Sequence, residues 1–293
     1  MPSRSSIHVS VLADEVMHWL APLPGQTIVD GTLGGGGHTR LLAQRVGAAG
    51  RVVAVDQDQA ALDRAERELQ GQPVLIAQGN FADVPEVLAA AEIEQVDGVL
   101  LDLGLSSDQL ADSERGFSFD SAGPLDLRFD GERGEPAWRL LARLQEKELA
   151  DLIYQYGEER FSRRIARAVV ARRNENPVRT AAELAELVAR CVPKSPVERI
   201  HPATRTFQAL RIAVNDELKS LERALERLPN CLRPGGRLAV ISFHSLEDRL
   251  VKEAFRDDPR WKALTRKPVR PSEAEIASNP RSRSAKLRVA ERV

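Results

Sequence analysis

Short apolar runs alternate with amphipathic segments through the N-terminal third of the chain. The runs at 27–30, 51–55, 74–78 and 96–103 are rich in Val, Ile and Leu, as expected of strands that are buried on both faces. The segments between them carry apolar residues at helical spacing. This β-α-β-α-β-α-β order predicts a parallel sheet covered by helices, with any ligand at the carboxyl ends of the strands.

The pattern changes after residue 107, where strand signals almost disappear until about residue 205. Three segments in this stretch look helical: 136–156, 160–174 and 180–191. The last begins with Thr180 and Glu183, which resemble a capping box. We therefore predict a small helical domain, residues 108–205, inserted after the fourth strand.

The strand-and-helix pattern then returns and continues to the end of the chain. It predicts a long helix over 206–228, a fifth strand over 234–243, and an antiparallel hairpin from 262–268 and 285–289. Residues 1–107 and 206–293 thus form one α/β domain in two parts. An antiparallel ending is typical of methyltransferase sheets and unusual in dehydrogenases.

Four consecutive glycines follow the first strand, after Asp30. Glycines allow a sharp turn and a close approach to a ligand, and the free N–H groups at a helix start favour an anionic group. The spacing D-x-x-x-G-x-G, through Gly34 and Gly36, differs from the dinucleotide fingerprint. It resembles the first motif of S-adenosylmethionine-dependent methyltransferases. The alternative is a glycine-rich surface turn without a ligand.

Acidic residues also end the second and fourth strands. Asp56 stands 20 positions after Gly36, where a carboxylate accepts hydrogen bonds from the ribose hydroxyls of an adenosyl cofactor. A helix N-cap is the alternative role for Asp56. Phe81 follows the third strand and Asp102 closes the fourth, so we expect both in the same crevice. The Phe81 ring is suited either to an adenine face or to core packing.

Composition sets limits on this interpretation. The chain has 293 residues, 42% of them hydrophobic, enough for one large domain or two modest ones. Cys191 and Cys231 have no metal-ligand spacing and make no disulfide framework, so we expect no metal and a reducing, cytoplasmic setting. We find no secretory segment and no apolar run near the ~20 residues of a membrane span, and expect a soluble protein.

Charge is distributed unevenly along the chain. Residues 160–211 carry 12 Lys and Arg against 4 Asp and Glu, and residues 260–293 carry 10 against 3, while the whole chain has a net charge of −1. Such segregation is typical of a protein that binds a polyanion such as nucleic acid. The alternative is a set of solvated helix faces.

Several longer motifs, taken in order, resemble one family: the RsmH (MraW) methyltransferases, which methylate the exocyclic N4 of a cytidine in small-subunit ribosomal RNA. The resemblance covers nearly the whole chain. The motifs are H-V-S-V-L-A-D-E-V (8–16), the glycine loop, L-L-D-L-G-L-S-S-D-Q-L (100–110), E-R-G-F-S-F (114–119), G-P-L-D-L-R (123–128), Y-G-E-E-R-F (156–161), H-P-A-T-R-T-F-Q-A-L-R-I (201–212), S-F-H-S-L-E-D-R (242–249) and N-P-R-S-R-S-A-K-L-R (279–288).

The resemblance implies a Rossmann-like class I methyltransferase sheet with S-adenosylmethionine as the cofactor. Together with the glycine loop, the resemblance implies one set of cofactor-binding residues. They are Asp30, Gly34, Gly36, Gly37, His38, Asp56, Phe81, Asp102 and Gln109. Among them Gly36, Gly37 and His38 would hold the methionine end. A helix-start histidine exposed to water is the alternative for His38.

Methyl transfer to a cytosine amine requires alignment and hydrogen bonding, because the amine lone pair is delocalised into the ring. Asp102, Ser106 and Ser107 lie on the loop after the fourth strand and are the candidate amine contacts. Ser106 and Ser107 are also suited to capping the next turn. Methylation at carbon five would need a cysteine nucleophile, and neither cysteine stands beside the cofactor loop.

The target base must be unstacked, so aromatic and basic residues are expected near the crevice. The candidates by motif position are Phe117, Phe119, His201, Arg205, Phe243, His244 and Arg249. For Phe117 and Phe119 the alternative is an apolar anchor of the insert. The expected partner is small-subunit ribosomal RNA, naked or in an assembled subunit, and a homodimer is compatible with the sequence.

Two other classes of function stay open. A small-molecule methyltransferase would share the fold and cofactor but has little use for two basic segments. A non-catalytic RNA-binding assembly protein would keep the basic surfaces, but the intact glycine loop, Asp56 and Asp102 count against it.

Overall fold

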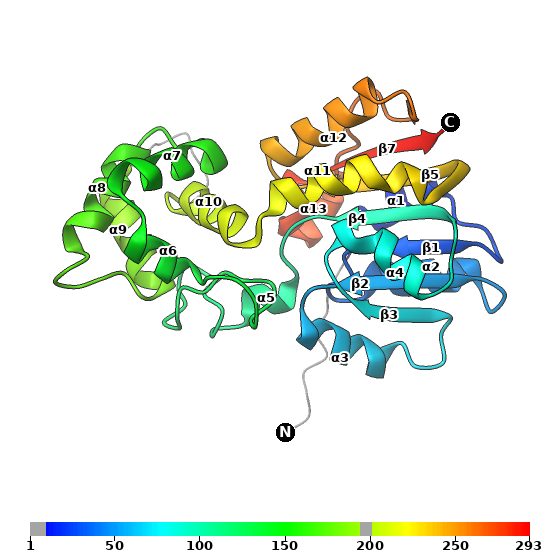
Figure 1. Ribbon diagram of the computed structural model, residues 1–293, viewed down its shortest axis with the longest axis horizontal. Helices are drawn as coiled ribbons and strands as arrows, with labels where there is room; N and C mark the ends of the chain where they lie inside the picture. Colours follow the sequence, from blue (N-terminus) through cyan, green and yellow to red (C-terminus); the bar gives the residue numbers. More distant parts are fainter. Residues whose placement is uncertain (1–9, 194–200) are drawn as a thin grey trace. The chain divides into compact units, whose positions relative to one another are not determined.

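The computed structural model describes residues 10–193 and 201–293, which form two compact units (Figure 1). The first unit combines the N-terminal part, up to Ser106, with Leu218–Val293, and the second is Ser107–Glu217. His8 and Val9, which begin the first of the family motifs, lie outside the described residues.

The first unit is built on one seven-stranded sheet in the order β3-β2-β1-β4-β5-β7-β6. The first five strands are parallel, and β7 is antiparallel to both β5 and β6, which confirms the predicted α/β sheet with an antiparallel ending. The strands are β1 (Thr27–Asp30), β2 (Arg51–Asp56), β3 (Val74–Gln78), β4 (Val96–Asp102), β5 (Leu232–Ser242), β6 (Trp261–Ala263) and β7 (Lys286–Arg292).

Helices cover both faces of this sheet, as alternation along β2 illustrates. Val52 and Ala54 point to one core and Val53 and Val55 to the other. The first core includes α1 (Ala13–Leu20), α2 (Gly37–Val46) and α3 (Gln59–Glu68). The second includes α4 (Val84–Ala90), α11 (Glu217–Arg227) and α12 (Ser245–Asp257), and α13 (Glu273–Ser278) precedes the last strand.

The second unit is helical, as the loss of strand signals predicts. Its helices are α5 (Ser107–Ala111), α6 (Ala137–Arg143), α7 (Glu146–Gly157), α8 (Ser162–Arg172), α9 (Ala181–Cys191) and α10 (Thr204–Asn215). The predicted capping box at the start of α9 is confirmed, because Thr180 Oγ1 accepts the Glu183 N–H and Glu183 Oε2 accepts the Thr180 N–H. Gly157 lets α7 pack closely on α10, since a Cβ there would stand 2.4 Å from the Arg205 carbonyl oxygen.

Two predicted helices are each divided in the structure. The predicted helix 206–228 is α10 and α11, separated by Asp216, whose φ of +51° is left-handed. The predicted helix 136–156 is α6 and α7, separated by the extended residues Leu144 and Gln145. In both places one or two residues leave the helical region without interrupting the apolar spacing, so the pattern does not reveal the break.

The boundaries of the insert and of the last hairpin also differ from expectation. The second unit runs to Glu217 and includes α10, whereas the sequence assigned 206–293 to the sheet domain. Strand β6 ends at Ala263 instead of 268, because the N–H groups of Leu264 and Thr265 both turn to the Val289 carbonyl. Among the described helices, none is long and apolar enough to cross a membrane.

Candidate active site

Three carboxylates lie at one edge of the sheet in the first unit. Asp30, Asp56 and Asp102 are the last residues of β1, β2 and β4, which run parallel side by side. Parallel strands bring their carboxyl ends to the same edge, so the structure gathers these residues as expected. Burial raises the pKa of Asp56 and of Asp102, and repulsion from Asp30 adds to the rise in both.

Asp30 is fully buried behind the glycine loop. Its Oδ2 accepts the Thr39 hydroxyl at 2.6 Å, and its Oδ1 accepts the Thr32 N–H at 3.2 Å. Burial raises the pKa of Asp30, and these hydrogen bonds oppose that rise. The carboxylate therefore joins the two sides of the loop, with Thr32 before the glycines and Thr39 after them.

Asp56 is tied to the glycine loop by its own carboxylate. Asp56 Oδ2 accepts the Gly34 N–H at 2.8 Å, and Oδ1 accepts the Asp58 N–H at 2.9 Å. Burial raises its pKa to about 6, against the lowering effect of these two bonds. The N-cap of α3 is Asp58, whose Oδ1 accepts the Ala60 N–H at 3.1 Å. Asp56 is thus not the capping residue.

The glycines are required by backbone conformation at two positions. Gly34 and Gly36 have φ of +50° and +73°, and Gly36 is the residue before α2. Gly37 is the first residue of that helix, and His38 follows it. The His38 side chain is only 5% exposed, so the structure does not support the water-exposed alternative.

Asp102 and His38 face each other at this edge, with Nε2 and Oδ2 3.6 Å apart. Asp102 is 18% exposed, and its Oδ1 is buried without a hydrogen-bond partner among the described residues. Burial, followed by repulsion from Asp30 and Glu247, raises its pKa to about 8. The Asp102 N–H donates to the Thr32 hydroxyl at 2.6 Å, which links β4 to the loop after β1.

Phe81 lies beside the end of β1. A Cβ on Gly31 would stand 3.1 Å from Phe81 Cβ and 2.6 Å from Leu101 Cδ2, so a larger residue there would require these side chains to shift. The Phe81 ring is half-buried at the edge of a core, which leaves part of it exposed. Asn80 holds the short turn that begins at Phe81, because its Oδ1 accepts the Ala82 N–H at 2.8 Å.

The loop after β4 is supported by Phe243. Gly104 has a φ of +126°, and a Cβ there would stand 3.1 Å from Phe243 Cδ2. Ser106 lies beside the glycine loop, since its Cβ would be 3.6 Å from a Cβ on Gly34. The sequence predicted a substrate contact for Phe243, and the structure gives its ring a contact with the β4 loop.

Glu247 is a site residue that the sequence analysis missed. Its Oε2 accepts the N–H groups of Phe243 and His244 at 2.8 and 3.3 Å, and its Oε1 lies 3.1 Å from His244 Nε2. His244 caps α12, with Nδ1 accepting the Glu247 N–H. The spacing of His244 and Glu247 is that of a capping box, which is the signal that would have identified the pair. Arg249 is exposed on α12.

The remaining predicted residues lie in the second unit. Phe117 is 5% exposed and stacks on Phe129 with ring centroids 5.9 Å apart, which favours the anchor alternative. Phe119 stacks on His201 at 4.6 Å, and His201 Nδ1 accepts the Ala203 N–H. Ser107, Gln109 and Arg205 belong to this unit too, Ser107 and Gln109 in α5 and Arg205 in α10.

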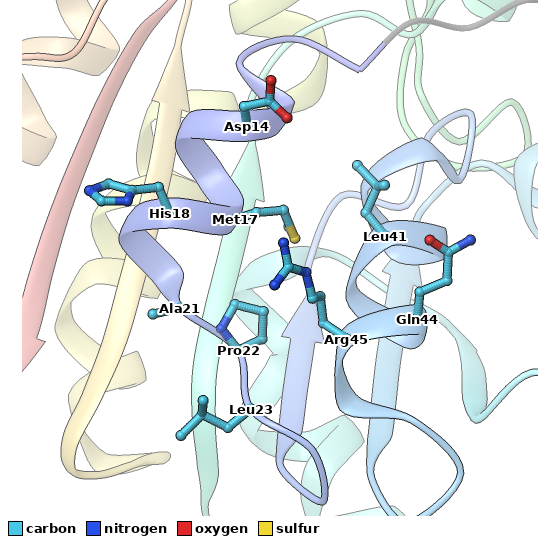
Figure 2. Close-up of a pocket in the computed structure, with 9 residues that line it drawn as sticks. All are labelled: Asp14, Met17, His18, Ala21, Pro22, Leu23, Leu41, Gln44 and Arg45. Carbon is cyan, nitrogen blue, oxygen red and sulfur yellow. The ribbon is translucent and has the colours of Figure 1, made fainter.

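A pocket of about 700 Å³ lies elsewhere on the first unit, between α1 and the second half of α2 (Figure 2). Met17, Leu41 and Arg45 are among its lining residues. No predicted site residue lines it, and the α2 residues that line it come from the half of that helix away from Gly37, so it is distinct from the carboxylate edge.

Sheet order, glycine loop and strand-end carboxylates together define a class I, S-adenosylmethionine-dependent methyltransferase. The chain belongs to the MraW methylase family, which matches residues 5–293. It is 55% identical to the Ribosomal RNA small subunit methyltransferase H of Rhodopirellula baltica, over 98% of this chain and 91% of that protein. Proteins of the same name from Deinococcus deserti and Deinococcus radiodurans are 53% and 54% identical, over 99% and 97% of this chain and 95% and 89% of their own lengths.

Proposed function

We propose that this protein transfers the methyl group of S-adenosylmethionine to the exocyclic N4 of a cytidine in small-subunit ribosomal RNA, in the decoding region. Family membership and the names of its relatives support the RNA substrate. The observation that carries the chemistry is Asp102, a half-buried carboxylate at the end of β4 whose Oδ1 has no hydrogen-bond partner among the described residues, beside His38 and the glycine loop.

The residues at the carboxylate edge fit an adenosylmethionine cofactor. Gly34 and Gly36 let the backbone approach a ligand closely, and His38 stands in the first turn of α2. Each Asp56 oxygen accepts one backbone N–H and keeps a lone pair for a ribose hydroxyl. The other proposed cofactor contacts are Gly37, Phe81, Asp102 and Gln109, while Asp30 holds the loop from behind.

The bound cofactor supplies an electrophilic methyl group. An amine that accepts this methyl group must give up one proton. Asp102 accepts a hydrogen bond from the amine and then takes this proton, which requires its ionised form. Because burial and neighbouring carboxylates raise its pKa to about 8, it is a stronger base than an exposed aspartate. Ser106 and Ser107 are the proposed further amine contacts.

The substrate side of the site is proposed from aromatic and basic residues. Phe119 and His201 form a stacked pair in the second unit, near Arg205 in sequence. His244 and Arg249 would contribute from α12, and Phe243 holds the β4 loop in place. Phe117 anchors the insert from within. The basic segments 160–211 and 260–293 are the proposed docking surfaces for RNA phosphates.

Methyl incorporation and nucleotide mapping test the proposal. Purified protein with labelled S-adenosylmethionine is incubated separately with naked small-subunit ribosomal RNA and with subunits from cells that lack the gene, and the product nucleoside is identified. We expect one labelled N4-methylated cytidine. Label at carbon five, or no label on either substrate together with turnover of a metabolite, would overturn the assignment.

A further inference from the structure

Trp138, on α6 of the second unit, has two arginines over its indole ring. The Arg139 and Arg179 Cζ atoms lie 5.1 and 4.4 Å from the ring centroid, within cation–π distance. The indole is half-buried, whereas both arginines are exposed. We call these three residues the arginine–tryptophan cluster.

Main-chain hydrogen bonds hold two residues of the cluster, Trp138 and Arg179, to Leu125. The Trp138 N–H donates to the Leu125 carbonyl at 2.9 Å, and the Leu125 N–H donates to the Arg179 carbonyl at 2.8 Å. The Arg179 N–H in turn donates to Glu183 Oε2 at 2.7 Å, within the capping box of α9. The backbone next to the arginine side chains is therefore held in place. The indole ring restricts the positions that the two guanidinium groups can take.

The guanidinium groups of the cluster lack the hydrogen-bond acceptors that neighbouring arginines have. Among the described residues, neither the Arg139 nor the Arg179 guanidinium makes a hydrogen bond or ion pair. By contrast, Arg143 on the same helix pairs with Glu135 at 2.8 Å, and Arg173 donates to the Leu141 and Leu144 carbonyls. Two positive charges are thus placed together on the surface with their N–H donors unused.

We propose that the arginine–tryptophan cluster binds the phosphate backbone of the RNA substrate, an inference that rests on the proposed function. A guanidinium group presents a planar fork of donors that matches phosphate oxygens in pairs, and stacking on an indole reduces the entropy lost when the fork binds. The arginines already cover the indole, so the ring does not stack on a base. The cluster therefore recognises phosphate charge and does not distinguish between bases.

The test compares a double variant with a matched control from the same helix. Arg139→Gln with Arg179→Gln removes two unpaired charges, whereas Arg143→Gln removes an arginine that is committed to Glu135. Affinity for naked small-subunit ribosomal RNA is measured over a range of salt concentrations, and KM for RNA and kcat are measured on the same preparations. Thermal midpoint and adenosylmethionine affinity check that each variant is folded.

We expect the double variant to bind RNA about tenfold or more weakly, as the loss of charge-assisted bonds implies. The slope of log affinity against log salt should fall by roughly 0.7 for each phosphate contact that is lost. KM for RNA should rise while kcat at saturating RNA stays at the wild-type value. Arg143→Gln should change none of these quantities.

Trp138→Leu provides a second, charge-neutral test. It keeps an apolar side chain and both arginines, but it removes the aromatic surface that orders them, so RNA affinity should fall with the salt slope nearly unchanged. Equal effects of Arg143→Gln and the double variant would overturn the inference, as would wild-type RNA affinity in the double variant. Both outcomes are measured relative to a wild-type protein that methylates RNA. If the proposed function is wrong, the wild type itself is inactive, so the two kinds of failure can be told apart.

Discussion

The pKa of the Asp102 carboxyl group is strongly raised by its surroundings in the site. Its pKa is raised to about 8 by burial and by repulsion from Asp30 and Glu247. The carboxylate is therefore largely protonated at neutral pH before cofactor binds, and it ionises as the pH rises. If it takes the amine proton, kcat/KM for adenosylmethionine should increase with pH through about 8.

Asp102→Asn should abolish this rise and strongly reduce methyl transfer, because the amide keeps the shape and cannot accept the proton. Folding stability should change with pH in the opposite direction to kcat/KM. A pKa raised in the folded state stabilises the protein below the unfolded value of 3.8, and this contribution is lost as pH rises through about 8. As the pH rises from 3.8 to about 8, thermal unfolding should therefore show a smaller loss of stability in the variant than in wild type. A pH–rate profile that keeps its rise in the variant would assign the proton to another group.

Asp56 gives a second residue-level prediction, on cofactor affinity. Asp56→Ala removes two acceptor oxygens at the end of β2, so calorimetry should show adenosylmethionine binding weakened about tenfold or more. Because the pKa of Asp56 is raised to about 6, wild-type affinity should fall as the pH is lowered through that value. Asp58→Ala is the matched control: it removes the α3 cap and should lower stability with little effect on affinity.

Sequence patterns locate residues at strand ends better than they describe the partners of those residues. Asp30, Asp56 and Asp102 were placed at one edge because each closes an apolar run of a parallel sheet. The hydrogen bonds that enclose Asp30 come from Thr32 and Thr39, two and nine residues further along the chain, whereas the repulsion between Glu247 and Asp102 joins segments far apart in the chain. Spacing along a single sequence carries little information on such contacts.

Among the elements, the loop after β4 depends on one glycine. Gly104 has a φ of +126° and lies against Phe243, so Gly104→Ala adds backbone strain and a contact at 3.1 Å. Strain of this kind costs about 1–3 kcal/mol, and the new contact adds to it. Methyl transfer should also fall, because the loop that holds Asp102 and Ser106 shifts. Thermal unfolding and turnover measure the two effects.

Gly71→Ala is the control for Gly104→Ala, since Gly71 has a φ of +79° and nothing within 4 Å of its added Cβ. It should lower stability through strain alone and leave turnover intact. Equal losses in the two variants would show that the Phe243 contact is unimportant. A Phe243→Leu background, in which the ring is removed, should reduce the difference between them.

The prediction of elements was most accurate where burial imposes a pattern. The start of β2 and the start of α9 agree with the sequence, because a run of four buried residues and a capping box leave clear signals. The break at Asp216 leaves no signal in the sequence, because apolar residues keep their helical spacing on both sides of this single left-handed residue between α10 and α11. The second unit ends at Glu217, the residue after this break.

At the scale of the whole molecule, one of the two basic segments belongs to a different unit from the proposed cofactor site. The glycine loop and its carboxylates belong to the first unit, as does the basic segment 260–293, whereas the basic segment 160–211 belongs to the second. The buried face of α8 consists of Ser162, Ile165, Ala166 and Val169. Arg163, Arg164 and Arg167 occupy other positions on this helix, and the Arg163 side chain is exposed.

Reversal of Arg163, Arg164 and Arg167 to Glu should therefore weaken RNA binding and leave adenosylmethionine affinity intact. Phosphate contacts release counterions, so log affinity falls with log salt by roughly 0.7 per neutralised phosphate on single strands, and the variant should show a flatter slope. The control reverses three exposed arginines of the first unit, Arg45, Arg51 and Arg67, with the same change in net charge. Equal losses in both triple variants would indicate a general effect of net charge, whereas an unchanged slope in the α8 variant would make that helix a solvated face that takes no part in RNA docking.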